Sequence, residues 1–144
     1  MISIDSNVLV YAFKTQDANH AVAKETMEKL LNQQEQVALT DIVMFEFIAQ
    51  VTLKLGSAPV PTPAQALAQL ENWLSAENVS VIRNSPKNFA TFNRLCAETG
   101  RTGQKIYDAQ IAAICIDNGV TEFITNDKGF EKFTELRIRN PFAA

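Results

Sequence analysis

Four acidic residues stand at places where carboxylates often do chemistry. Asp5 follows the apolar run I-S-I, and Asp127 follows the run E-F-I-T-N. Glu46 lies inside the stretch V-M-F-E-F-I-A, and Asp108 opens the run Y-D-A-Q-I-A-A-I-C-I. If the strand before Asp5 and the strand before Asp127 are neighbours in a parallel sheet, all four side chains can face one crevice at the carboxyl ends of the strands.

Such a group of acids predicts a divalent cation. Four carboxylates without Lys or Arg partners repel one another, and one or two divalent cations relieve that repulsion. Mg²⁺ and Mn²⁺ prefer hard oxygen ligands of this kind. Bound cations polarise a phosphoryl oxygen and activate a water molecule for in-line attack. The spacing therefore indicates metal-assisted hydrolysis of a phosphate ester.

Each acid also has a purely structural interpretation. Asp5 and Asp108 are suited to capping helices, and Asp127 is suited to a turn or a cap. Glu46 is the hardest to explain in this way, because helical spacing puts it beside an apolar stripe, where an unpaired carboxylate costs several kcal/mol. Its structural alternative is a place at the edge of the stripe, from which it reaches water or a Lys.

Other candidate residues have weaker patterns. Asp41 is expected to cap a helix, and Asp117 lies nine residues after Asp108, which places it about half a turn round the same helix. His20 has no Cys, His or acid at metal-ligand spacing. Cys96 and Cys115 lack a CxxC spacing and are expected to be small buried hydrophobes in a reducing compartment. No Ser/His/Asp set, Gly-rich phosphate loop or zinc spacing competes with the four acids.

The length and composition of the chain fit one domain over residues 1–144. The hydrophobic fraction is 47% and the charged fraction is 20%, as in ordinary globular proteins. The chain has no apolar run long enough to cross a membrane and begins with a strand, so a cytoplasmic protein is expected. The net charge of −3 is uneven, with four Lys/Arg against nine Asp/Glu before residue 80 and nine against seven from there on.

Strands alternate with helices along the chain. This alternation predicts an α/β fold with a parallel sheet and helices on both of its faces. Asn19 and Thr40 are candidate N-caps, and Gly56 is expected to end the third helix. The strands are expected at 2–4, 36–39, 79–82, 122–125 and 136–139, and the helices at 8–13, 21–31, 42–55, 63–74, 89–98 and 106–118.

The fourth helix carries a set of large apolar residues that helical spacing places on one side, namely Leu67, Leu70, Trp73 and Leu74. A patch that includes Phe45, Phe47 or Trp73 could belong to an interface or to the core. The core is the commoner place for such side chains.

The chain resembles the PIN-domain ribonucleases, and among them the VapC-type toxins of type II toxin–antitoxin pairs. The matching pieces are I-D-S-N-V-L-V-Y-A, A-L-T-D-I-V-M-F-E-F, Y-D-A-Q-I-A-A-I-C-I-D-N-G-V and F-I-T-N-D-K-G-F with the tail L-R-I-R-N-P. Each motif is short, so the specificity lies in their combination and order. The resemblance implies a three-layer α/β/α sandwich around a parallel sheet of about five strands.

The resemblance also implies an Mg²⁺- or Mn²⁺-dependent endoribonuclease with an acidic quartet. Asp5, Asp108 and Asp127 would hold the metal, and Glu46 would complete the cluster directly or through a water. The family pattern implies that nearby polar groups orient these carboxylates; the candidates are Ser6, Asn7 and Thr125.

The expected partners follow from the same resemblance. Single-stranded or looped RNA would be the substrate, and the basic residues Arg101, Lys105 and Lys128 are candidates to hold its phosphates. A homodimer is expected, as is an antitoxin whose C-terminal segment covers the site with an arginine among the acids.

Two alternatives stay open. The first is another metal-dependent phosphohydrolase acting on DNA or a small ester, although this chain has D-S-N where aspartyl-phosphate enzymes have D-x-D. The second is a non-catalytic binding module that keeps the fold and uses its acidic pocket to capture a basic partner.

Overall fold

The computed structural model describes residues 1–143, and it builds them around one parallel sheet. The strand order is β3-β2-β1-β4-β5, and each neighbouring pair is parallel. The strands are β1 (Ile2–Ile4), β2 (Val37–Thr40), β3 (Val79–Ile82), β4 (Glu122–Ile124) and β5 (Arg137–Arg139). The helices are α1 (Ser6–Phe13), α2 (His20–Leu31), α3 (Asp41–Thr52), α4 (Pro63–Leu74), α5 (Phe89–Thr99) and α6 (Ile106–Asp117), with short 3-10 turns η1 (Pro86–Asn88), η2 (Gly103–Lys105) and η3 (Lys128–Lys132).

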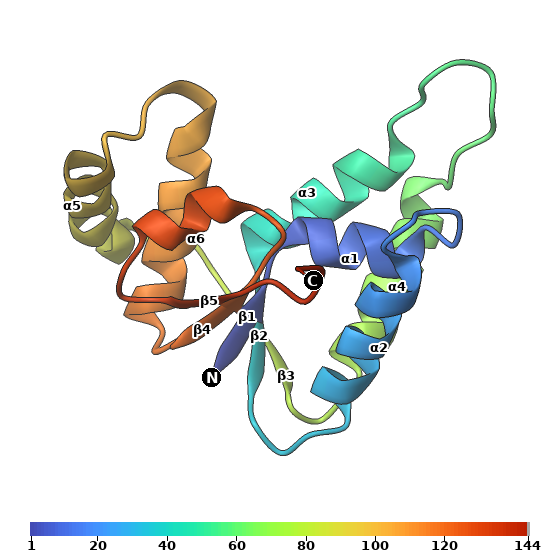
Figure 1. The fold of residues 1–144 in the computed structure, drawn as a ribbon, viewed down its shortest axis with the longest axis horizontal. Coiled ribbons are helices and arrows are strands. Elements are labelled where there is room, and N and C mark those ends of the chain that lie inside the picture. The colour runs from blue at the N-terminus through green and yellow to red at the C-terminus, as the bar shows by residue number, and fades with distance from the viewer. Residues whose placement is uncertain (144) are drawn as a thin grey trace.

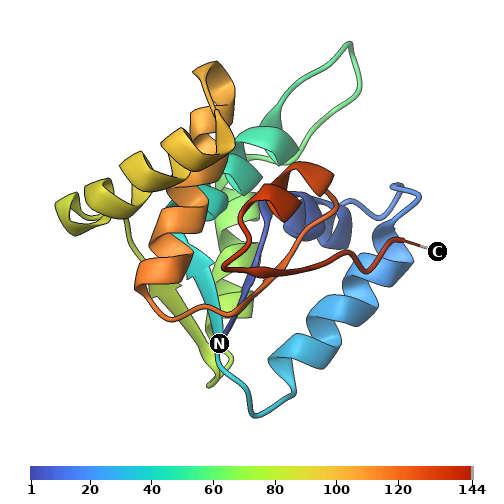
Figure 2. The ribbon, with the colours of Figure 1, turned by 60° about the vertical axis from the view of Figure 1, so that its left-hand side comes forward.

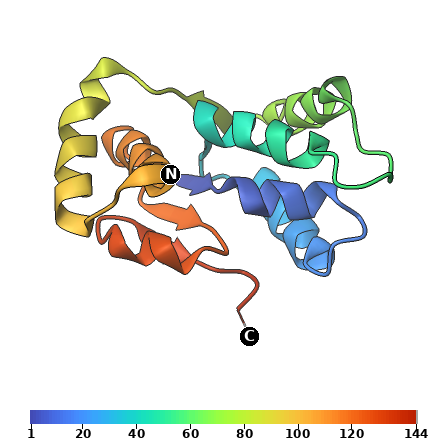
Figure 3. The same ribbon diagram turned by 90° about the horizontal axis from the view of Figure 1, so that it is seen from above.

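The sheet lies between two helical layers, as expected for a three-layer α/β/α sandwich. Helices α5 and α6 lie on one side of the sheet, while α1, α2 and α4 lie on the other (Figure 1; Figure 3). Each parallel pair needs a crossover, and helical crossovers cover the sheet faces with apolar side chains. The prediction of a parallel sheet with helices on both faces is confirmed.

Strand β1 lies in the centre of the sheet. Ile4 pairs with Ile124 of β4, and Ser3 pairs with Ala38 of β2. All three residues of β1 are buried, as are Val37–Thr40 of β2. The condition that the first and fourth strands are neighbours is therefore met, and the residues that follow them meet at the same edge of the sheet.

Helix α6 is embedded between the sheet and α5. Small and branched apolar residues from Ala109 to Cys115 allow it to pack closely on both neighbours, and most of them are fully buried. Because α6 leads into β4 and runs antiparallel to it, the first turn of α6 lies at the carboxyl end of the strands. That first turn carries Asp108.

Helix α3 ends earlier than the sequence predicts. It stops at Thr52 rather than near Gly56, although Gly56 does adopt a positive φ of 77° in the following segment. Leu53 and Leu55 are 58% and 76% exposed, so a further helical turn would not be stabilised by packing against the core. The segment from Leu53 to α4 projects from the body of the molecule (Figure 2).

Two other local expectations need correction. Leu67 does not share the buried side of α4, because it is 47% exposed while Leu70 and Trp73 are buried. Asn19 stands at the N-cap position of α2 but makes no side-chain cap hydrogen bond; instead its N–H donates to Asp17.

The aromatic residues divide between core and surface. Phe47 packs edge-on to Phe13 at 5.5 Å and against Trp73 at 5.4 Å between ring centroids, which joins α3 to α1 and α4. Phe47 and Trp73 are therefore core residues, whereas Phe45 is 71% exposed. Within residues 1–143, no helix combines the length and the apolarity that crossing a bilayer requires.

Candidate active site

Asp5 is fixed at the carboxyl edge of the sheet by the residues on either side of it. It follows β1 directly, and its N–H donates to the carbonyl of Ile124 at 2.9 Å. Its Oδ1 accepts the N–H of Ser6 at 2.8 Å, so the residue caps α1, as its structural interpretation predicts. Its Oδ2 accepts the hydroxyl of Thr125 at 2.6 Å. The capping role and a place in the site are thus compatible.

The hydroxyl of Thr125 connects Asp5 to the loop after β4. It donates to Asp5 and accepts from Asn7 Nδ2 at 3.2 Å and from the N–H of Asp127 at 2.9 Å. One donated and two accepted hydrogen bonds use the full capacity of a hydroxyl. Thr125 is completely buried, so its orientation is fixed. These contacts place the Thr125 hydroxyl on the Asp5 carboxylate and on the backbone of Asp127, and its orienting role stays a prediction.

Asn7 reinforces the same connection. Its Nδ2 also donates to Asp5 Oδ2 at 3.3 Å, and its Oδ1 accepts the N–H of Asn126 at 3.3 Å. Asn126 in turn donates to the phenol of Tyr11 at 3.4 Å and accepts from Asn140. Sequence reasoning missed the contributions of Asn126 and Tyr11, because neither has a charge or a motif that marks it.

Glu46 faces the site from the second turn of α3. It is half-buried, and its Oε2 accepts the hydroxyl of Ser6 at 2.9 Å. The side chain of Thr40 begins α3 by accepting the N–H of Val43, which directs the helix away from the end of β2. Ser6 therefore contacts both acids, since its N–H binds Asp5 and its hydroxyl binds Glu46.

Asp108 and Asp127 complete the acidic region on the side of α6. Asp108 is half-buried, while Asp127 is exposed and caps η3 by accepting the N–H of Gly129 at 2.8 Å. The positive charges of Arg101 and Lys105 act on Asp108 and lower its pKa, but burial and the charge of Asp127 outweigh them and raise it.

Burial also makes the other two acids harder to ionise. It raises the pKa of Asp5 to about 6, against the hydrogen bonds from Thr125 and Ser6, and the charges of Glu46 and Asp108 add to the increase. Burial raises the pKa of Glu46, and the charge of Asp108 contributes. The charge of Asp108 thus contributes to the raised pKa of both Asp5 and Glu46.

The donor set fits a hard divalent cation in its chemistry. All four candidate ligands offer carboxylate oxygens, and in residues 1–143 none of them forms an ion pair with a Lys or Arg. The four acids are more widely spaced than a closed cage, because no three Asp, Glu, His or Cys side chains in that range are close enough together to hold a metal. Mg²⁺ is compatible with this spacing, since it is usually bound through one or two carboxylates and keeps several waters.

The remaining sequence candidates lie outside the acidic region. Asp117 accepts hydrogen bonds from Asn88 and Thr91. Asp41 accepts from the N–H groups of Ile42 and Asn84, so it does act as a local acceptor near the helix start, although Thr40 is the N-cap.

Two other side chains need separate mention. His20 contacts the carbonyl of Tyr11 through Nδ1 at 2.9 Å. Arg101, expected at the surface of the site, is 7% exposed. The polar loop sequence G-R-T-G does not indicate that the Arg101 side chain is buried.

Comparison with known proteins is consistent with this architecture. The model of the PIN domain family matches residues 2–136. The chain is 31% identical to VapC ribonuclease Mb2897 of Mycobacterium bovis over 98% of this chain and 95% of that protein. It is 30% identical to ribonuclease VapC33 of Mycobacterium tuberculosis over 98% of both chains.

Solved structures share the fold at lower identity. VapBC2 from Rickettsia felis, solved bound to a DNA fragment from its promoter, has a TM-score of 0.69 at 22% identity and covers 97% of this chain and 98% of its own. VapC20 from Mycobacterium tuberculosis, a toxin that cleaves the sarcin–ricin loop, has a TM-score of 0.69 at 20% identity, with coverage of 95% and 99%.

Proposed function

Since this chain belongs to the PIN-domain family and to its VapC ribonuclease group, we propose that it is an endoribonuclease toxin of a toxin–antitoxin pair that hydrolyses RNA phosphodiester bonds with the aid of Mg²⁺ or Mn²⁺. The proposed ligands and catalytic acids are Asp5, Glu46, Asp108 and Asp127.

One observation supports this proposal above the others: the hydrogen bonds that orient the acids come from neutral groups. Thr125, Asn7 and Ser6 donate to Asp5 or Glu46, and no Lys or Arg within the described chain pairs with either carboxylate. A purely structural buried acid is normally paired with a cation. Carboxylates oriented by neutral donors keep their charge available for a metal ion.

The residues have separate roles in the proposed reaction. Asp5, Asp108 and Asp127 would hold the cation, one or two of them directly and the rest through its water molecules. When bound, the cation would supply charge stabilisation at the scissile phosphate and lower the pKa of an attacking water. Glu46 has a raised pKa and is positioned by Ser6. A carboxylate with a raised pKa is suited to take a proton from that water. Thr125 and Asn7 keep Asp5 in a single orientation.

The proposed partners are RNA, an antitoxin protein and a second copy of this chain. Several solved relatives of this fold are toxin–antitoxin complexes, including VapBC from Salmonella typhimurium. An antitoxin segment with an arginine would satisfy acids that lack an internal cation. Sedimentation of the chain alone and with its antitoxin measures both associations.

The decisive test uses two aspartates on the same helix. Asp108→Asn removes a proposed ligand, while Asp117→Asn changes the same residue type at the far end of α6, where it binds Asn88 and Thr91. We expect cleavage of a mixed RNA panel in Mg²⁺ or Mn²⁺ to fall by about 100-fold or more in Asp108→Asn, a loss typical of a catalytic group. Asp117→Asn should retain its activity.

Other outcomes would favour the alternatives. Cleavage of DNA or small phosphate esters in preference to RNA would indicate a different phosphohydrolase. A folded, metal-bound protein that cuts no RNA in the panel, yet binds a basic peptide in competition with metal, would indicate a non-catalytic binding module. Equal activity of Asp108→Asn and the parent protein would remove Asp108 from the proposed site.

A further inference from the structure

Arg101 is a buried cation beside the acidic region that makes no ion pair there. It lies in the loop after α5, where Gly100 ends the helix with a φ of 68° and turns the chain inward. The side chain is 7% exposed, and its guanidinium lies over the ring of Phe133 at 5.6 Å from the centroid. Within residues 1–143, no Asp or Glu lies within ion-pair distance of it.

The hydrogen bonding of Arg101 is incomplete. Its Nη2 donates to the carbonyl of Gly129, while its Nε is buried without a partner in the described chain. Leaving a donor of a charged group unpaired in the interior is unfavourable, so the position calls for an explanation beyond local packing. The positive charge of Arg101 also favours the ionised form of Asp108 nearby.

Gly129 connects Arg101 to Asp127. Its carbonyl accepts from Arg101, and its N–H donates to Asp127 Oδ1. The two side chains approach it so closely that a Cβ on Gly129 would lie 2.9 Å from Arg101 Nη2 and 3.0 Å from Asp127 Oδ1. A side chain at position 129 would therefore have to displace Arg101 or Asp127.

We propose that Arg101 is a positioning residue that acts through Gly129 to set the orientation of Asp127 for a divalent cation. The buried guanidinium holds the start of η3, and η3 in turn holds the Asp127 carboxylate. The inference rests on the proposed metal site and deepens it. It also assigns Arg101 an internal role, in contrast to the surface contact with RNA phosphates that its sequence suggests.

The test measures cation binding directly. We would titrate Mn²⁺ into the complete chain by calorimetry for the parent protein, Arg101→Met, Arg101→Lys and Gly129→Ala. Arg101→Met is expected to weaken Mn²⁺ affinity by about tenfold or more, the loss typical of groups that orient metal ligands. Arg101→Lys, which keeps the charge and a donor for the Gly129 carbonyl, should recover part of that affinity.

A double-mutant cycle identifies the route of the effect. Gly129→Ala alone should weaken binding, because its new methyl group displaces Arg101 or Asp127. In the Arg101→Met background, Gly129→Ala should reduce Mn²⁺ affinity by a smaller factor, since the effects of mutations in residues that act together are not additive. Arg83→Met is the matched control, because it removes the same charge from an exposed arginine. It should leave Mn²⁺ affinity unchanged.

Several results would overturn the inference. Unchanged or tighter Mn²⁺ binding in folded Arg101→Met would exclude a positioning role, and so would fully additive effects in the cycle. If Arg101→Met fails to fold, Arg101→Lys and Gly129→Ala carry the test, and parent-like affinity in both would reject the inference. Absence of Mn²⁺ binding by the parent protein would reject the metal site itself, and this role with it.

Discussion

The Thr125 hydroxyl links residues that are far apart in the chain and close in space. It holds Asp5 by donating a hydrogen bond and receives one each from Asn7 and the backbone of Asp127. A hydroxyl with all three bonds made has no freedom to rotate. The orientation of Asp5 is thereby built into the protein before any cation arrives.

A consequence of burying Asp5 is a distinctive dependence of stability on pH. Because its pKa rises from 3.8 to about 6 on folding, the folded protein binds more protons than the unfolded chain between these values. The resulting stability is complete below pH 3.8 and is lost as pH rises through about 6, by about 3 kcal/mol.

Denaturation in urea with a chelator, from pH 4 to 7.5, measures this effect. The stability of the parent protein should fall relative to that of Asp5→Asn across the window, because the amide does not titrate. Mg²⁺ should restore stability at pH 7, since it favours the ionised carboxylate. Parallel curves for the two proteins would contradict the shift.

At the residue scale, the sequence supports prediction where type and context agree. Asp5, Ser6, Asn7 and Thr125 sit directly after strands one and four, and parallel pairing brings the ends of those strands together. Arg101 could not be predicted in the same way, because a polar loop sequence does not reveal that its side chain turns inward over Phe133.

Some elements are predictable here because β1 and β2 each lead directly into a capping residue and then an α-helix. The run A-L-T ends in Thr40, which accepts the N–H of Val43 and begins α3. The end of α3 was beyond such local reasoning. Leu53 and Leu55 favour a helix by propensity, but whether that helix continues depends on a packing partner that only the three-dimensional fold defines.

The two threonine caps allow the contribution of one helix to be isolated. Thr40 caps α3, which carries Glu46, and Thr62 caps α4 in a capping box with Gln65. Thr40→Ala and Thr62→Ala should each lower the free energy of unfolding by about 1 kcal/mol.

Only Thr40→Ala should also reduce RNA cleavage, because the start of α3 sets the position of Glu46 relative to Ser6. Thermal unfolding and a cleavage assay on both variants measure the two effects. Equal cleavage losses would show that general stability, rather than the placement of Glu46, controls activity.

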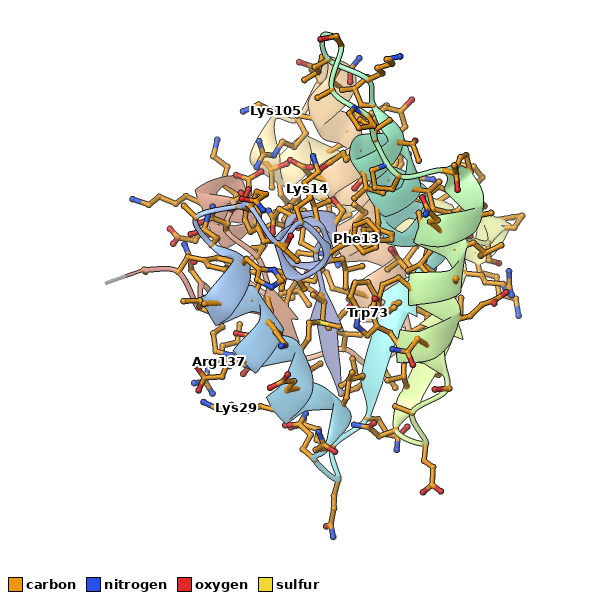
Figure 4. All side chains as sticks on the ribbon, turned by 90° about the vertical axis from the view of Figure 1, so that its right-hand side faces the viewer. Phe13, Lys14, Lys29, Trp73, Lys105 and Arg137 are labelled. Atoms are coloured by element: carbon orange, nitrogen blue, oxygen red, sulfur yellow. The ribbon has the colours of Figure 1, made fainter. Side chains whose placement is uncertain are left out.

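On the scale of the whole molecule, basic side chains lie toward both ends of the parallel strands. Lys14 and Lys105 lie toward the carboxyl ends of the strands, while Lys29 and Arg137 lie toward the opposite end (Figure 4). A chain with a net charge of −3 gains little from long-range attraction to RNA. Local cations beside the acids are then the residues best placed to hold substrate phosphates.

Lys105→Ala should therefore weaken RNA binding. It should also lower the magnitude of the slope of the logarithm of the binding constant against the logarithm of the salt concentration by about one, because each phosphate contact contributes about that much. Lys29→Ala is the control at the other end, where its ion pair with Glu25 is exposed. Filter binding at several salt concentrations measures both slopes. Identical slopes in the two variants would exclude Lys105 from the RNA path.

The central position of β1 in the sheet has a consequence for when the site can assemble during synthesis of the chain. Strand β1 is the centre of the sheet, yet its partner β4 comes more than a hundred residues later in the chain. Asp5 cannot accept the hydrogen bond from the Thr125 hydroxyl until that later segment has been synthesised. Contacts between residues so distant in sequence also form slowly. A nascent or truncated chain that ends before β4 consequently lacks both Thr125, which binds Asp5, and Asp127, one of the four proposed acids. The proposed active site is thus assembled only after β4 and the loop that follows it have been synthesised.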